Sequence, residues 1–145
     1  MRRMLIVVAA LALGLAGCGS DAEPADDASP TAAVAERPAS PAVLTIVEPQ
    51  AGATVGQDVV MELQLEGAEV IPEVTIELDP QEGHIHIKLD GETLSLLAGL
   101  REPLADLTGG TLAPGPHLLE TEFVAGDHGP FNPRVVATVS FTVEG

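Results

Sequence analysis

The chain has 145 residues, with 22 acidic and 6 basic side chains, and its formal net charge is −16. A surface this negative repels phosphate backbones, which excludes nucleic acid as a partner. Cys18 is the only cysteine, so an intramolecular disulfide, a thiol nucleophile inside the domain and a cysteine-based zinc site are also excluded.

The N-terminus has the pattern of a secretion signal. Arg2 and Arg3 provide positive charge, and an apolar run follows from Met4 to Leu15. That run is shorter than the roughly 20 residues that a permanent membrane-spanning helix needs. We therefore expect it to be removed during export.

The signal closes with Leu15-Ala16-Gly17-Cys18, which resembles the lipobox of bacterial lipoproteins. The resemblance implies a signal peptide over residues 1–17 and acyl chains, such as palmitate, on Cys18. It places the protein in the bacterial cell envelope, anchored to the membrane by lipid and facing the periplasm or the cell exterior. Gly19 after the cysteine resembles the default pattern for outer-membrane sorting in a two-membrane bacterium. An ordinary signal peptide with an incidental cysteine is the alternative.

Residues 18–41 are predicted to be a tether. They are rich in alanine, proline and acidic residues and contain almost nothing that could form a core. Such a composition is typical of a disordered, fairly extended segment. We expect it to hold a folded head away from the membrane surface.

Residues 42–145, about 100 residues, have the size of one small β-sandwich domain. Alternating apolar and polar residues predict strands over residues 43–47, 58–66, 73–79, 83–91, 116–124 and 134–143. Residues 93–114 follow neither the two-residue period of a strand nor the 3.6-residue period of a helix. Short edge strands and a single helical turn are both allowed there. The pattern predicts an all-β fold, an immunoglobulin-like or fibronectin-like antiparallel β-sandwich of about seven strands. Because the chain has no Tyr or Trp, this likeness is one of architecture only.

Residues 73–79 are expected to form a hairpin with the strand that follows them. Pairing Ile76 with Ile85 would bury the apolar side chains of both strands and place Glu77 opposite His84. In this arrangement the carboxylate would face the imidazole across the hairpin.

The most specific local feature is the strand over residues 83–91. Its isoleucines point to one face, while His84 and His86 point to the other, which we expect to be wet. If this strand lies antiparallel beside residues 116–124, its start meets the end of that strand and His117 lies at the opposite end. The residues brought together are then a candidate metal-binding set: His84, His86, His128, Glu122 and Asp127.

Imidazole and carboxylate ligands together suit Cu(II) or Zn(II). The sequence equally allows a structural role, in which His84 and His86 are solvated residues paired with Glu77 or with backbone groups. Asp127 and His128 would then fix their own loop by hydrogen bonds to the backbone. A pH response carried by the histidines is a third possibility.

Three motifs in the second half of the chain resemble a family of small bacterial secreted or lipid-anchored Ig-like domains. They are Gly-His-x-His-x-x-x-Asp-Gly at 83–91, Leu-x-Pro-Gly-x-His-x-Leu at 112–119 and Asp-His-x-Pro-x-Asn-Pro at 127–133. Arg134 stands where the resemblance leads us to expect a second proline. The family implies a fold and a compartment, and no biochemical activity to carry over.

No catalytic template is recognisable in the sequence, so we expect no enzyme activity unless a partner supplies the groups. The first interpretation is a membrane-anchored envelope lipoprotein whose head is a non-catalytic binding or structural module contacting another envelope protein. The alternative is a periplasmic or extracytoplasmic protein that binds Cu or Zn through His84, His86 and His128.

Overall fold

The computed structural model describes residues 36–145. The predicted signal peptide, Cys18 and most of the predicted tether lie outside the described residues. Within residues 36–145 the chain forms nine strands and one short helix. These are β1 (Val43–Glu48), β2 (Thr54–Val55), β3 (Val60–Glu66), β4 (Glu69–Val70), β5 (Glu82–Leu89), β6 (Glu92–Ala98), β7 (Arg101–Pro103), α1 (Leu104–Thr108), β8 (Gly115–Ala125) and β9 (Pro130–Val143).

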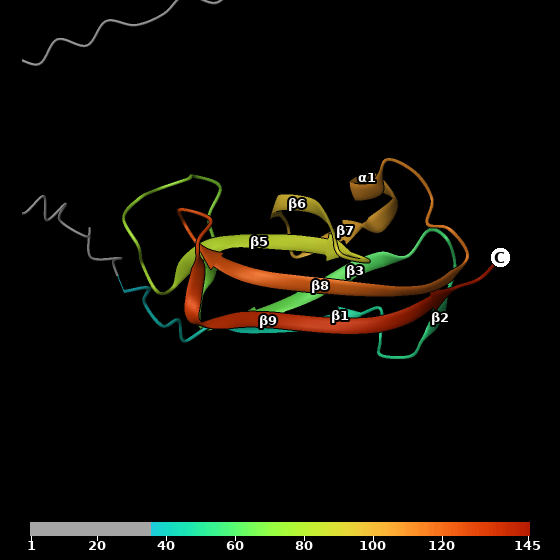
Figure 1. Cartoon of the computed structure of the whole chain (residues 1–145), viewed down its shortest axis with the longest axis horizontal. Coiled ribbons are helices and arrows are strands. Elements are labelled where there is room, and N and C mark those ends of the chain that lie inside the picture. The colour runs from blue at the N-terminus through green and yellow to red at the C-terminus, as the bar shows by residue number, and fades with distance from the viewer. Residues whose placement is uncertain (1–35) are drawn as a thin grey trace, which may run out of the picture. The chain divides into compact units, whose positions relative to one another are not determined.

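The strands form two sheets (Figure 1). One sheet has the order β1-β3-β7, and the other runs β2-β9-β8-β5, with β4 and β6 both on the far edge of β5. The long pairings are antiparallel, and the two-residue pairings of β2 with β9 and of β4 with β5 are parallel. The predicted all-β sandwich is confirmed.

The core lies between the sheets and follows from the alternation of apolar residues. Met61 of β3, Ile85 of β5 and Leu119 of β8 are fully buried. All three phenylalanines of the chain are buried as well: Phe123, Phe131 and Phe141. Burying a large apolar side chain contributes roughly 1.5–3 kcal/mol to stability. With no disulfide available, this core holds the sandwich together.

The hairpin predicted for residues 73–79 is wrong. The segment is a loop, in which the side chains of Val74 and Ile76 are 61% and 91% exposed. Both edges of β5 are already paired, one with β8 and the other with β6 and β4. A strand at residues 73–79 therefore has no free edge of β5 to pair with, although its sequence alternates correctly.

Residues 93–114 contain both of the structures that the sequence allowed. Strand β6 pairs with β5, β7 pairs with β3, and the helix α1 follows directly after β7. The helix ends at Gly109, which adopts the left-handed conformation with φ of 75°. Within the described part of the chain, no helix has the length and apolar character needed to cross a membrane.

Residues 36–41, which were expected to belong to the tether, contact the sandwich. Asn132 donates a backbone hydrogen bond to the carbonyl oxygen of Pro38, and Ser40 donates its hydroxyl to the carbonyl oxygen of Pro80. This segment, the loop between β4 and β5 and the turn between β8 and β9 meet at one end of the domain (Figure 1). We call this end the histidine end, because it carries His84, His86 and His128.

Candidate functional site

The pairing of β5 with β8 positions the histidines. Strand β5 lies antiparallel to β8, with His84 opposite Val124 and His86 opposite Glu122. The prediction that these two strands lie side by side is confirmed. Beyond β8 a tight turn brings His128 back toward β5. The backbone N–H of His128 donates to the carbonyl oxygen of Ala125 at 2.9 Å, and His128 itself has φ of 63°. This left-handed conformation is uncommon outside glycine, although histidine is among the residues that tolerate it.

His84 lies on the outer face of the sheet but is fully buried, so the expectation of a wet face is wrong at this position. The loop after β4 covers it. Nδ1 of His84 is 3.0 Å from the carbonyl oxygen of Ile71, and Nε2 is 3.1 Å from the carbonyl oxygen of Gly126. Thr75 also donates a backbone hydrogen bond to Gly126, which closes the loop over the ring.

Because both nitrogens of His84 face carbonyl oxygens, this ring has no lone pair directed at an ion. A neutral imidazole donates one of the two hydrogen bonds and an imidazolium donates both. The ring also lies face to face with His128, with the two ring centroids 4.4 Å apart and the planes 18° apart. His84 is therefore a structural residue that joins two loops and supports His128.

His86 and His128 contact each other through nitrogen atoms. Nε2 of His86 lies 3.0 Å from Nδ1 of His128, and the ring planes are 20° apart. The ring centroids are 5.3 Å apart. This equals the N–N distance plus about one ring radius for each ring, so the two centroids and the two nitrogens lie close to one straight line. The two rings therefore meet edge to edge, with the N–N contact in line with both rings.

Burial disfavours the charged form of both rings. It lowers the pKa of His86, and the neighbouring His128 lowers it further, while Glu122 acts in the opposite direction. Burial likewise lowers the pKa of His128, with a further decrease from His84 that Asp127 partly offsets. At neutral pH the two rings are neutral and share one N–H···N hydrogen bond.

The two carboxylates of the predicted metal set are engaged with arginines. Arg134 donates from Nε and Nη2 to the two oxygens of Glu122, at 2.7 and 2.5 Å. Arg37 donates from its two terminal nitrogens to Asp127, at 2.6 and 2.8 Å. The hydrogen bonds from Arg37 are the main reason why the pKa of Asp127 falls to about 2. Both carboxylates are thus occupied as counterions.

One feature of this end was not predicted from the sequence: Arg37 and Arg134 neutralise the two carboxylates. The pairing of His84 with backbone groups was one of the expected alternatives, and the carbonyl oxygens of Ile71 and Gly126 are those groups. Asp127 also fixes its own loop, as that alternative expected, by accepting a hydrogen bond from the backbone N–H of Gly129. A usable signal was the scarcity of cations, because a chain with so few of them pairs each one readily with a carboxylate.

His117 lies at the other end of β8, as the strand pairing predicted. Its Nδ1 is 2.7 Å from Asp90 and its Nε2 is 2.8 Å from the carbonyl oxygen of Ala113. The hydrogen bond to the backbone at Ala113, together with Asp90, raises the pKa of His117 despite an opposing effect of burial. Burial acts to raise the pKa of Asp90, but hydrogen bonds from Leu118 and His117 outweigh it and lower that pKa.

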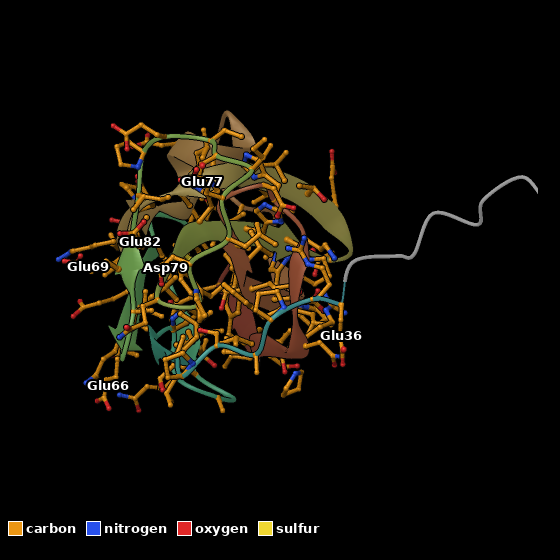
Figure 2. All side chains as sticks on the ribbon, turned by 90° about the vertical axis from the view of Figure 1, so that its left-hand side faces the viewer. Glu36, Glu66, Glu69, Glu77, Asp79 and Glu82 are labelled. Carbon is orange, nitrogen blue, oxygen red and sulfur yellow. The ribbon has the colours of Figure 1, made fainter. Side chains whose placement is uncertain are left out.

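The histidine end is strongly acidic. Six exposed carboxylate residues lie on it or around it in the view of Figure 2: Glu36, Glu66, Glu69, Glu77, Asp79 and Glu82. None of the six takes part in an ion pair among residues 36–145. Their negative potential concentrates cations near the histidines.

Over residues 36–145, no group of three or more His, Cys, Asp and Glu side chains is arranged to hold a metal ion. Three of the five residues in the predicted metal-binding set are therefore not available as ligands. His84, Glu122 and Asp127 are committed to other partners. His86 and His128 remain, with two ring nitrogens that face each other.

Comparisons with known proteins give no family. No protein-family model matches the chain, and no curated protein matches it. Among solved structures, CopC from Methylosinus trichosporium OB3b matches with a TM-score of 0.40 and 16% sequence identity, covering 70% of this chain and 93% of that chain. A similarity at this level says nothing about the function of this chain.

Proposed function

We propose that the protein is a lipid-anchored envelope protein whose non-catalytic head binds a transition-metal ion between His86 and His128. The observation that carries this proposal is the contact of 3.0 Å between Nε2 of His86 and Nδ1 of His128. With metal–imidazole bonds of about 2.0 Å, two ligand nitrogens of one ion lie about 2.8–4.0 Å apart, depending on the angle at the metal. Because this contact lies in line with both rings, an ion held along it needs the two nitrogens to separate from 3.0 Å to the upper end of this range.

Three features of the histidine end support metal binding. Neutral imidazole nitrogens are ligands that suit copper and zinc. The exposed carboxylates around this end attract cations without competing for the ring nitrogens. His84 stacks on His128 and is itself fixed by two backbone contacts, so it orients one of the two ligands.

The anchoring part of the proposal rests on the sequence. The lipobox-like tetrad ending at Cys18 supports lipid attachment, and more than one acyl chain is what stable anchoring requires. The acidic surface does not favour anionic lipid, so the acyl chains would hold the protein at the membrane. Binding of another envelope protein by the same head is compatible with this arrangement.

The test is a titration of the purified full chain, carrying Cys18→Ser to remove the thiol, with Cu(II), Zn(II) and Ag(I), the last as a redox-inert substitute for Cu(I). We expect one ion to bind per chain, and we expect His86→Gln and His128→Asn each to abolish binding. Asn is chosen at residue 128 because it tolerates a positive φ. His117→Gln is the matched control, since this histidine lies at the other end of β8, and it should bind like the parent.

Two results would contradict the metal proposal. Binding that survives both His86→Gln and His128→Asn would place the ion elsewhere. No binding by the parent would leave the histidines as structural residues and favour the head as a module that contacts another envelope protein.

A further inference from the structure

We infer that the His86–His128 pair is a two-coordinate site for a monovalent d10 ion, Cu(I), and that it selects this ion over Cu(II) and Zn(II). This inference rests on the proposed metal binding and adds the identity of the ion. It follows from the direction of the two nitrogens, the number of ligands within reach and the charge that the site can accept.

The direction of the nitrogens favours linear coordination. The N–N contact lies in line with both rings, so an ion placed on it is bound from opposite sides. Opening the N–N distance from 3.0 Å to about 4 Å would give two bonds of ordinary length. His128 lies in the turn beyond β8 and is not one of the residues paired between β8 and β9, so this opening would fall in the turn. Linear two-coordination is characteristic of monovalent d10 ions, whereas Zn(II) is tetrahedral and Cu(II) is tetragonal.

Among residues 36–145, no further side chain is free to bind an ion at this point. Both nitrogens of His84 face carbonyl oxygens, and the carboxylates of Glu122 and Asp127 are each bound to an arginine. Zn(II) or Cu(II) would have to complete its coordination with water or break one of these arginine pairs. A two-coordinate ion needs neither.

The groups in direct contact with the histidine pair favour a monovalent ion, whereas the exposed carboxylates farther out attract cations of either charge. Two neutral imidazoles carry no negative charge, and the carboxylates beside them are neutralised by Arg37 and Arg134. The free energy of removing an ion from water rises with the square of its charge, so a divalent ion loses more hydration here than a monovalent one.

Binding of the ion needs no external acid or base to remove the hydrogen that lies between the two rings. In the free protein, one of the two facing nitrogens carries the hydrogen of the shared N–H···N bond. When the ion binds, this hydrogen moves to the other nitrogen of the same ring, Nδ1 of His86 or Nε2 of His128. Both rings remain neutral, no proton is released and the oxidation state of the ion does not change.

The test uses the full chain carrying Cys18→Ser, under anaerobic conditions, with Cu(I) and Ag(I) compared against Cu(II) and Zn(II). We expect Cu(I) and Ag(I) to bind at least tenfold more tightly than either divalent ion. X-ray absorption of the Cu(I) form should show two nitrogen ligands and no sulfur. Because the chain has four histidines, ¹⁵N spectra of the Ag(I) form can report on each ring, and Nε2 of His86 and Nδ1 of His128 should shift. His86→Gln should lose these signals, and His117→Gln should keep them.

The outcomes separate this inference from the proposed function. If Zn(II) or Cu(II) binds as tightly as Cu(I) through the same two histidines, or if Cu(I) has three or more ligands, the selectivity inference fails and the proposed metal binding stands. If no ion binds, both fail.

Discussion

Replacing Gly83 by alanine should destabilise the domain by about 3 kcal/mol. Gly83 begins the pairing of β5 with β8, opposite Ala125. A Cβ atom there would lie 1.9 Å from the carbonyl oxygen of Val124 and 3.0 Å from Cζ of Phe123. Relieving the first contact requires the two strands to separate by roughly 1 Å. Overpacking of this kind costs about 1–3 kcal/mol, and each ladder hydrogen bond that is lost adds about 1 kcal/mol.

The free energy of unfolding of the full chain in urea, measured for Gly83→Ala and the parent, tests this expectation. Gly110→Ala is the matched control, because a Cβ atom at that position meets nothing within 4 Å. The control should differ from the parent by less than about 0.5 kcal/mol. A midpoint of thermal unfolding for Gly83→Ala about 12 °C below that of the parent corresponds to the same loss. If Gly83→Ala unfolds like Gly110→Ala, the close approach of β5 and β8 is wrong.

Three further predictions concern histidines and the cysteine. His84→Phe should reduce the free energy of unfolding by about 1–3 kcal/mol, because the imidazole N–H donates to one of two carbonyl oxygens at a buried position and this hydrogen bond is lost; a loss below about 0.5 kcal/mol in urea would contradict this. The pKa of His117 is raised in the folded state, so its contribution to stability is complete below about pH 6.5 and is lost as the pH rises through the folded pKa. The stability difference between the parent and His117→Gln should therefore shrink as the pH is raised from 6 toward 9, and a constant difference would argue against the ion pair with Asp90. Cys18→Ser should abolish palmitate labelling and release the protein from the membrane fraction, and unchanged labelling would refute the lipobox.

The strands that the sequence predicted correctly are those with a simple burial pattern. Alternation located β3 and the part of β9 from residue 134 onward because each has one face in the core, and it located β8 although the end of that strand is buried on both faces. The same signal failed at residues 73–79, because alternation says nothing about which strand edges are free. Whether a segment can pair depends on the whole topology, and here β6 and β4 had already taken the edge of β5.

The candidate site was predicted in part, for a similar reason. The antiparallel placement of β5 beside β8 was enough to bring His128 to His84 and His86. The burial of His84 could not be predicted, because it depends on a loop that folds over the outer face of the sheet. The arginine partners were also out of reach, because a surface ion pair between residues as distant as Arg37 and Asp127 leaves no local pattern in the sequence.

The attachment of residues 36–41 decides where the domain can be cut or labelled. A fragment that starts at Ala42, the boundary suggested by composition, would lack the guanidinium group of Arg37, which covers Gly129 and pairs with Asp127. The turn carrying His128 would then lose its outer support, so a fragment for biophysical work should begin at or before residue 36. A dye or affinity handle belongs at the C-terminus instead, because β9 ends beside Gly115, at the opposite end of β8 from the histidines.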